Sequence, residues 1–179
     1  MKNIEVEVRS FIDAERYQQL IDFFDQEAKF IKEDNQITHY FTWPHDLRIQ
    51  KNDYFSKIRF KKWQLHDDFR EEIEIKFDKE DFEKLQQLFT HLWYEIDITW
   101  VRKRLQFDWN GIDVSLDFTK GYWYIIELEI LSTELDKNAN LQILYKKFDE
   151  LGISITPKEE FTKKFDWYKQ NRKTLISDH

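Results

Sequence analysis

The sequence predicts an α+β protein built around a mainly antiparallel sheet. About eight segments alternate apolar and charged residues with a period of two, the pattern of strands that bury one face. About four further segments carry apolar residues at helical spacing. Hairpin connections dominate, and the clearest turn signal is Asn110-Gly111, so strands that follow one another should pair antiparallel.

The elements of the first half are expected in the following order. A first strand covers roughly residues 2–11, and Asp13 then caps a helix with apolar positions Tyr17, Leu20, Ile21, Phe24 and Ile31. Strands follow over residues 36–42, 47–51, 54–62 and 69–77. Asp78 with Asp81 indicates the start of a second helix, whose apolar positions are Phe82, Leu85, Leu88, Phe89 and Leu92.

The second half continues the alternation. A strand over 98–108 turns at Asn110-Gly111 into a strand over 112–118, and a turn at Gly121 leads into a strand over 122–131. A third helix carries Leu135, Leu141, Leu144, Tyr145, Phe148 and Leu151 and ends at Gly152. Residues 156–159, Thr-Pro-Lys-Glu, form a capping box with Pro at the first helical position, which predicts a fourth helix.

Length and composition limit the possible classes of protein. The 179 residues fit one domain, 1–179, and a hydrophobic fraction of 41% is ample for a core. Cysteine is absent, which excludes disulfides and thiolate metal sites. We find no apolar run of about 18 residues and no signal peptide, so we expect a cytoplasmic protein without a membrane partner. A net charge of −7 argues against a nucleic-acid partner, and we expect a monomer or homodimer.

Charged residues fill one face of almost every predicted strand. Glu5, Glu7 and Arg9 share one face of the first strand, opposite Ile4 and Val6. The other such sets are Lys57, Arg59 and Lys61; Arg70, Glu72, Glu74 and Lys76; Arg102 and Arg104; Asp113, Ser115 and Asp117; and Glu127 with Glu129. For any one strand, a face exposed to solvent is the simpler explanation. Here, however, negative and positive charges lie on different strands, and a solvated face does not readily explain this joint pattern.

A closed sheet would turn these charges into the interior of a barrel. Isolated buried charges are prohibitive, so the side chains would have to pair with each other or with bound ions. Carboxylates suit hard cations such as Mg²⁺ or Mn²⁺, and Arg and Lys suit phosphate. A barrel of about eight strands has room for a small ligand, so the pattern indicates a site for a metal ion and a polyphosphate.

The charged motifs together resemble a known family. Glu5-x-Glu7-x-Arg9 is similar to the Glu-x-Glu-x-Lys motif of CYTH domains, the triphosphate tunnel metalloenzymes. Further similar motifs follow in the family's order: Leu47-Arg48-Ile49, Lys61, Arg70-x-Glu72-x-Glu74, Arg102-x-Arg104-x-x-Phe107, and Asp117, Gly121, Glu127 and Glu129. The resemblance covers Glu5 to about Leu131, and the C-terminal helices, residues 132–172, lie beyond it.

The resemblance implies an eight-stranded antiparallel β-barrel, a triphosphate tunnel, with flanking helices. It implies Mg²⁺ or Mn²⁺ as cofactor, with ligands drawn from Glu5, Glu7, Asp117, Glu127 and Glu129. It assigns phosphate contacts to Arg9, Arg48, Lys61, Arg102 and Arg104, and a supporting role to Glu72 and Glu74. Arg9 and Glu127 are the residues expected to act in catalysis.

Several positions depart from the family's pattern. Arg9 replaces a Lys, which exchanges a compact charge for a planar, bidentate one. Gln50 replaces a common Arg, and Arg59, on the same face as Lys61, is expected to compensate as a phosphate contact. Trp123 replaces a Gly, and the last helix lacks the family's Ser-Tyr pair.

The implied activity is metal-dependent hydrolysis of a triphosphate, either inorganic tripolyphosphate or a nucleoside or thiamine triphosphate. Two alternatives stay open, a class IV adenylyl cyclase and a non-catalytic polyphosphate- or nucleotide-binding module. The His-Phe pair of such cyclases is expected ahead of Glu5, where only residues 1–4 stand, which disfavours that activity. Trp43, Trp63, Trp100 or Trp123 could stack on a substrate ring, and His39 is expected outside the barrel.

Overall fold

Eight antiparallel strands form the centre of the molecule. The structure is a computed structural model that describes residues 4–61 and 69–176, with side chains over 4–61 and 72–172. The strands are β1 (Ile4–Ile12), β2 (Lys29–Phe41), β3 (Asp46–Lys51), β4 (Ser56–Lys61), β5 (Phe69–Phe77), β6 (Ile96–Trp109), β7 (Ile112–Thr119) and β8 (Tyr124–Ser132). The helices are α1 (Ala14–Glu27), a 3₁₀ turn η1 (Lys79–Asp81), α2 (Phe82–His91), α3 (Lys137–Glu150) and α4 (Lys158–Ile176).

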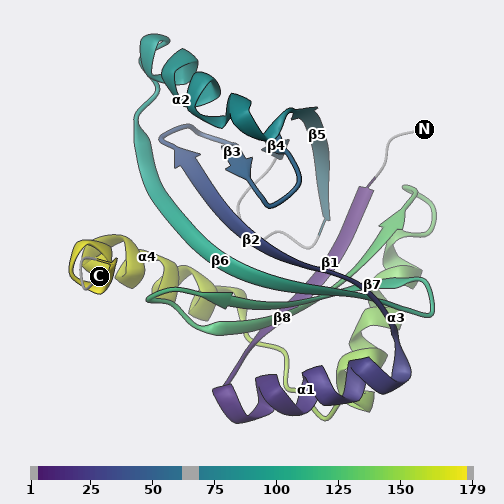
Figure 1. Ribbon diagram of the computed structural model, residues 1–179. Coiled ribbons are helices and arrows are strands. Elements are labelled where there is room, and N and C mark those ends of the chain that lie inside the picture. The colour runs from purple at the N-terminus through teal and green to yellow at the C-terminus, as the bar shows by residue number, and fades with distance from the viewer. Residues whose placement is uncertain (1–3, 62–68, 177–179) are drawn as a thin grey trace.

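The strands close into a barrel. Their spatial order is β1-β5-β4-β3-β2-β6-β7-β8, and β8 returns to β1. The β1–β8 ladder runs from Ile4↔Ser132 to Ile12↔Tyr124, and in the described part of the chain β1 meets β5 through three residue pairs. Figure 1 shows that β2 and β6 are long and curved and run side by side through the middle of the fold. The predicted α+β class and antiparallel barrel are therefore confirmed.

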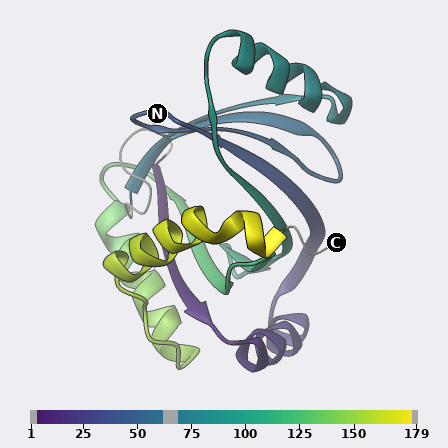
Figure 2. The same ribbon diagram turned by 90° about the vertical axis from the view of Figure 1, so that its left-hand side faces the viewer.

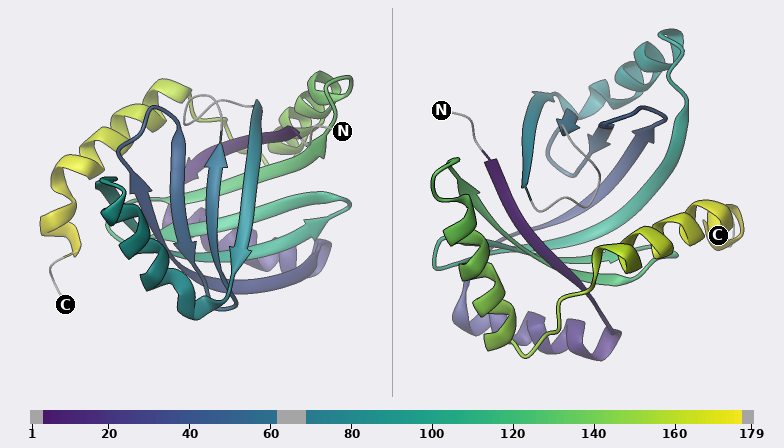
Figure 3. Two further views of the ribbon diagram at one scale, coloured as in Figure 1. Left: turned by 90° about the horizontal axis from the view of Figure 1, so that it is seen from above. Right: turned by 180° about the vertical axis from the view of Figure 1, so that it is seen from behind.

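The apolar cores lie outside the barrel, beneath the helices. Val6 and Val8 of β1 point outward and pack with Phe24 of α1 and Phe148 of α3 in the larger core. A second core joins β2 and β3 to Phe82 and other residues of α2. The helices surround the ring in both views of Figure 3. Because each strand buries its apolar face outward, its charged face is left for the interior.

Helix α4 lies across one open end of the barrel, as Figure 2 shows. Its approach is fixed to β1, because the Ser10 hydroxyl donates to the Ser154 carbonyl at 2.7 Å and lies 2.8 Å from the Thr156 hydroxyl. The rings of Phe11 and Phe161 stack with centroids 4.2 Å apart. These contacts hold α4 where its side chains can reach the interior.

Two local expectations were wrong. Helix α1 ends at Glu27, so Ile31 belongs to β2, which begins at Lys29 rather than near residue 36. Neither Asp78 nor Asp81 makes a side-chain capping hydrogen bond at the start of α2. The predicted fourth helix is present as α4, and the Thr156 hydroxyl before it accepts the Phe11 N–H at 3.0 Å. Among the described residues, no helix has the length and apolar character needed to cross a membrane.

Candidate functional site

A charged cavity runs into the barrel interior. Inward-facing side chains from the strands meet two aromatic residues of α4 around this cavity. The lining residues are Glu7, Arg9, Tyr40, Arg48, Arg59, Lys61, Trp100, Arg102, Arg104, Asp117, Tyr122, Ile125, Glu127, Phe161 and Phe165. The period-two pattern of the strands therefore places the charged faces inside, as the sequence indicates.

Three carboxylates converge at one part of the wall. Glu5, Glu7 and Glu129, here called the acidic cluster, each offer an oxygen within 4.8 Å of the others. The β1–β8 register sets Glu7 directly opposite Glu129. Burial, followed by the charges of Glu5 and Glu127, raises the pKa of Glu129 to about 8. A set of oxygen donors whose mutual repulsion is this strong fits a hard divalent cation such as Mg²⁺ or Mn²⁺.

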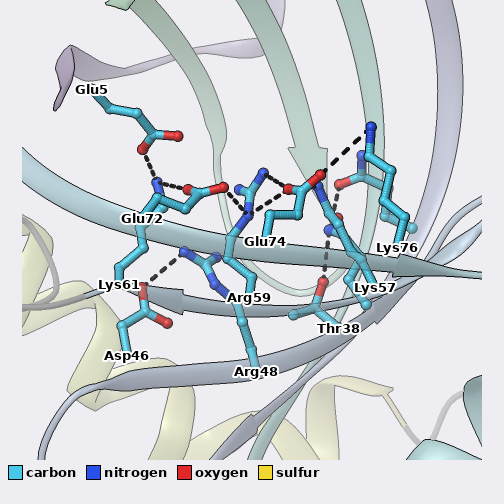
Figure 4. A network of polar contacts seen from close by, with 12 residues as sticks. Glu5, Thr38, Asp46, Arg48, Lys57, Arg59, Lys61, Glu72, Glu74 and Lys76 are labelled. Atoms are coloured by element: carbon cyan, nitrogen blue, oxygen red, sulfur yellow. Dashed lines mark hydrogen bonds and ion pairs between the residues drawn. The ribbon is translucent and has the colours of Figure 1, made fainter. Parts of the chain in front are cut away.

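Lys61 from β4 reaches the acidic cluster and also lines the cavity that the arginines share. Its ammonium forms an ion pair with Glu5 and lies 3.6 Å from a Glu7 oxygen and 3.1 Å from a Glu72 oxygen. Figure 4 shows Lys61 between Glu5 and Glu72. Burial raises the pKa of Glu5, and the charge of Lys61 opposes that rise. The only described side chain with ion pairs to both Glu5 and Glu7 is thus Lys61.

Arg102 and Arg104 of β6 form the opposite wall with Asp117 of β7. Arg104 donates to both Asp117 oxygens at 2.7 Å, and Arg102 donates to one of them at 3.0 Å. Burial would raise the pKa of Asp117, but the two guanidinium groups hold it below its usual value. Burial and the nearby charge of Arg104 lower the pKa of Arg102, so one carboxylate does not fully compensate this pair. An added anion would stabilise both charges.

A second group of ion pairs lies on β4 and β5. Arg59 contacts Glu72 at 3.1 Å and Glu74 at 2.8 Å, and Lys57 contacts Glu74 at 2.7 Å (Figure 4). Burial would raise the pKa of Glu74, but Arg59 and Lys57 lower it to about 2. Burial, with the charge of Arg59, lowers the pKa of Lys57 to about 7. Glu72 and Glu74 therefore position the basic side chains of this wall.

Arg48 of β3 also lines the cavity, beside Tyr40. Its guanidinium donates to Asp46 at 2.8 Å and to the Tyr40 hydroxyl at 2.7 Å. Its buried Nε has no hydrogen-bond partner among the described residues. A buried guanidinium N–H without a partner beside a cavity is suited to donate to an incoming anion.

Gln50, which replaces an Arg of the family's pattern, faces inward. Its amide donates to Gln36 and Thr38, each at 3.0 Å. The Gln36 carbonyl oxygen also accepts from Arg102 Nε at 2.9 Å. The substitution thus exchanges a charge for a network of amides that holds Arg102 in place.

Arg9 and Glu127 lie opposite each other on β1 and β8. The Arg9 guanidinium is 3.9 Å from a Glu7 oxygen, and its carbon lies 4.8 Å above the Phe161 ring. Glu127 lies 3.5 Å from Arg104. Both predicted catalytic residues therefore stand between the acidic cluster and the wall that Arg102 and Arg104 form.

The structure brings together some of the predicted site residues and separates others. Glu5, Glu7 and Glu129 converge as expected of metal ligands, whereas Asp117 and Glu127 lie beside Arg104. All the predicted phosphate contacts line the cavity: Arg9, Arg48, Arg59, Lys61, Arg102 and Arg104. His39 lies outside the barrel, where its ring packs on Phe82 and Nδ1 is 2.9 Å from the Thr99 hydroxyl.

One part of the cavity is aromatic and was not predicted from the sequence. Its members are Tyr40, Trp100, Tyr122, Phe161 and Phe165, here called the aromatic wall. Trp100 was considered among the tryptophans, and it shares the inward parity of Arg102 and Arg104. Trp43 and Trp123 are not cavity residues, and Trp63 lies outside the described residues. The alternation of side chains along β2 could have placed Tyr40 on the inward face. The alternation along strands says nothing about Phe161 and Phe165, which belong to helix α4.

Comparison with known proteins identifies the fold. No family model matches the chain, and no curated protein matches its sequence. A solved structure from Pyrococcus horikoshii is 22% identical, with a TM-score of 0.73 over 86% of this chain and 95% of that one. A candidate adenylate cyclase from Vibrio parahaemolyticus is 14% identical, with a TM-score of 0.71 over 91% of this chain and 99% of that one.

A third structure is that of HpAC1 from Hippeastrum, described as a candidate adenylyl cyclase with a dominant triphosphatase activity. It is 18% identical, with a TM-score of 0.62 over 99% of both chains. Sequence identities this low establish a shared fold but do not establish a shared activity. The architecture that the resemblance implies is thus confirmed: the chain has the closed antiparallel barrel fold of these solved structures.

Proposed function

We propose that the protein hydrolyses a triphosphate in the barrel with the help of a divalent metal ion. The observation that carries the proposal is the meeting of the acidic cluster and a wall of guanidinium groups in one cavity. A metal ion and a phosphate chain need these two opposite environments a few ångströms apart. The partner is then a small molecule that contains a triphosphate, and the proposed setting is the cytoplasm, with the protein as a monomer or homodimer.

The basic residues would bind and orient the phosphate chain. Arg102 and Arg104 offer two planar guanidinium groups, and Arg48 offers a free N–H, so successive phosphates can be held at fixed positions. The same fixed donors would stabilise the charge that develops on the leaving phosphate. Arg59, held by Glu72 and Glu74, would contact the chain from the β4 side.

The acidic residues would hold the metal and handle the proton. Glu5, Glu7 and Glu129 would hold Mg²⁺ or Mn²⁺, and a bound ion of this kind neutralises phosphate oxygens and makes water a better nucleophile. Glu127 lies between Arg104 and the Arg9 side of the cavity, where it can accept the proton of the attacking water. Arg9, fixed by Glu7 and the Phe161 ring, would orient the phosphate that is attacked.

The aromatic wall favours an organic triphosphate over inorganic tripolyphosphate. Trp100 and Tyr122 have ring centroids 4.8 Å apart and line the same cavity as the arginines. Flat aromatic surfaces stack on a nucleobase or a thiamine ring, and inorganic tripolyphosphate has no ring to stack. An adenylyl cyclase would use the same surfaces, and the triphosphatase activity of HpAC1 supports hydrolysis as the first choice.

The proposal is tested with purified protein, Mg²⁺ or Mn²⁺, and tripolyphosphate, ATP or thiamine triphosphate as separate substrates. We expect phosphate or pyrophosphate release that requires the metal, and a loss on the order of 100-fold in Glu127→Gln if Glu127 acts as the base. The exposed Glu134 provides the matched control Glu134→Gln, which should keep full activity.

Other outcomes separate the alternatives. Cyclic AMP from ATP would identify a cyclase, and tight binding of all three compounds without turnover would identify a binding module. Absence of both binding and turnover would contradict the proposed function.

A further inference from the structure

We propose that Lys61 is a built-in counter-cation of the acidic cluster, which a divalent metal must displace and which bound triphosphate draws away. Lys61 would thereby couple metal binding to triphosphate binding. This inference rests on the proposed function, because it concerns the same metal and phosphate sites.

The position of the Lys61 ammonium is the first step. It contacts Glu5 and Glu72 and lies 3.6 Å from Glu7, so it stands among the carboxylates that would hold a metal. Its side chain is 3% exposed. A divalent cation bound by Glu5 and Glu7 would face this ammonium at short range in a buried site, where repulsion between like charges is strong. The metal alone should therefore bind weakly.

The surroundings of Lys61 supply the second step. Its side chain also lines the cavity that contains Arg59 and Arg104, the proposed phosphate contacts. A lysine side chain has four rotatable bonds and a compact charge, so a small rotation can transfer the ammonium from carboxylate to phosphate. A phosphate chain in the cavity gives Lys61 a new anionic partner and relieves the repulsion on the metal.

Thermodynamic linkage supplies the third step. If triphosphate strengthens metal binding by removing Lys61 from the cluster, the metal must strengthen triphosphate binding by the same factor. The protein would then remain largely free of metal until substrate arrives. Lys61 acts here as a positioning residue, since its effect on the metal is exerted by occupying the cation position.

The experiment compares metal binding by the wild type and Lys61→Met. Mn²⁺ is titrated into metal-free protein and followed by electron paramagnetic resonance, which needs no turnover. We expect Lys61→Met to bind Mn²⁺ on the order of tenfold more tightly than the wild type, because the competing charge is gone. Lys57→Met is the matched control, since Lys57 lies on the same face of β4 and pairs with Glu74, away from the acidic cluster. Its Mn²⁺ affinity should stay within twofold of the wild type.

The titration is repeated with a methylene-bridged tripolyphosphate analogue, whose P–C–P bridges resist hydrolysis. The analogue should tighten Mn²⁺ binding in the wild type and in Lys57→Met, and by a clearly smaller factor in Lys61→Met. A protein-free titration corrects for the complex that the ion and the analogue form in solution.

The outcomes distinguish this inference from the proposed function. Equal Mn²⁺ affinity in wild type and Lys61→Met, or an equal effect of the analogue in both, overturns the role of Lys61 and leaves the metal site standing. No Mn²⁺ binding to any variant, even with the analogue, overturns the metal site and the inference together. Lys61→Gln, which keeps hydrogen-bond donors for Glu5 and Glu72, serves as a second variant. Thermal unfolding with and without Mn²⁺ checks that each variant is folded, and Mn²⁺ should stabilise Lys61→Gln more than the wild type.

Discussion

Replacing Glu129 with Gln should stabilise the metal-free protein, and increasingly so as the pH rises. The unfolded carboxyl ionises near its ordinary pKa of 4.5, whereas burial and the neighbouring carboxylates raise the folded pKa to about 8. Between these values the folded state binds one more proton than the unfolded state, so this contribution to stability is lost as the pH rises through 8. The Gln side chain has the shape and neutrality of the protonated acid and avoids the loss.

The size of the effect follows from the two pKa values. One pKa unit corresponds to about 1.4 kcal/mol, so the advantage of Glu129→Gln should be near zero at pH 4, about 2 kcal/mol at pH 6 and at most on the order of 4 to 5 kcal/mol above pH 8. The difference in stability between the variant and the wild type should therefore grow between pH 4.5, the ordinary pKa, and about pH 8, the raised pKa of Glu129. An advantage this large would be a substantial part of the stability of a domain of this size.

Urea unfolding followed by the fluorescence of the seven tryptophans measures this difference, with EDTA present to remove divalent ions. The control is Glu15→Gln, on the exposed surface of α1. The free energy of unfolding of this variant should follow that of the wild type at both pH 5 and pH 9. The reasoning is refuted if the advantage of Glu129→Gln is the same at pH 5 and pH 9, or if the variant is the less stable protein at pH 9. Added Mn²⁺ should favour the wild type instead, because the variant lacks one metal ligand.

Three further predictions concern the framework around the site. Phe148→Ala should cost about 3–5 kcal/mol in urea unfolding, because the ring is fully buried in the larger core, and a cost below about 1 kcal/mol would contradict that packing. Ser10→Ala should cost about 1–3 kcal/mol, because the Ser154 carbonyl and the Thr156 backbone N–H lose the hydrogen bonds that the Ser10 hydroxyl makes with them; an unchanged midpoint of thermal unfolding would contradict this. Glu74→Gln should cost about 1–3 kcal/mol at neutral pH, because two cationic neighbours lower the pKa of Glu74 to about 2. That contribution is complete above about pH 4.5 and is lost as the pH falls through 2, so acid titrations of wild type and variant should converge at low pH and not run parallel.

The period of two in the strands predicted which side chains enter the barrel, because it depends on backbone geometry alone. It placed Glu5 and Glu7 on the charged face of the first strand and Glu129 on the charged face of the last strand. In the structure, the three carboxylates meet inside the barrel. The pairing of Glu7 with Glu129 depends on the register between the first and last strands, which lie far apart in the sequence. The resemblance to a family supplied Glu7 and Glu129 only as two of five candidate metal ligands, and the structure shows that they pair.

The ion-pair partners of Lys61 could not be predicted from the pattern of single strands. Lys61 belongs to a basic strand, so a role with phosphate is the natural expectation. Its neighbour in the ladder is Glu72, and its nearest partner in space is Glu5, on a strand reached only when the barrel closes. Charge balance within the closed barrel therefore determined its partners.

The early part of β2 and the aromatic wall were missed for related reasons. Residues 29–35 are rich in charge and have weak strand propensity, but β6 pairs with them along most of their length and overrides that preference. Phe161 and Phe165 are one helical turn apart on α4, a spacing that predicts a buried face. Which surface they meet depends on how the preceding loop attaches to β1.

The placement of the two apolar cores outside the barrel separates the side chains that hold the fold together from those that contact a ligand. Among the described residues, the larger core is shared by α1, α3 and the outer faces of four strands, and none of its buried members lines the charged cavity. Selection can therefore rewrite the interior while leaving the hydrophobic scaffold intact, provided that each new charge finds a partner. This division accounts for how structures with barely a fifth of their residues in common can keep one architecture, and it makes the barrel a practical framework for laboratory evolution of new anion receptors.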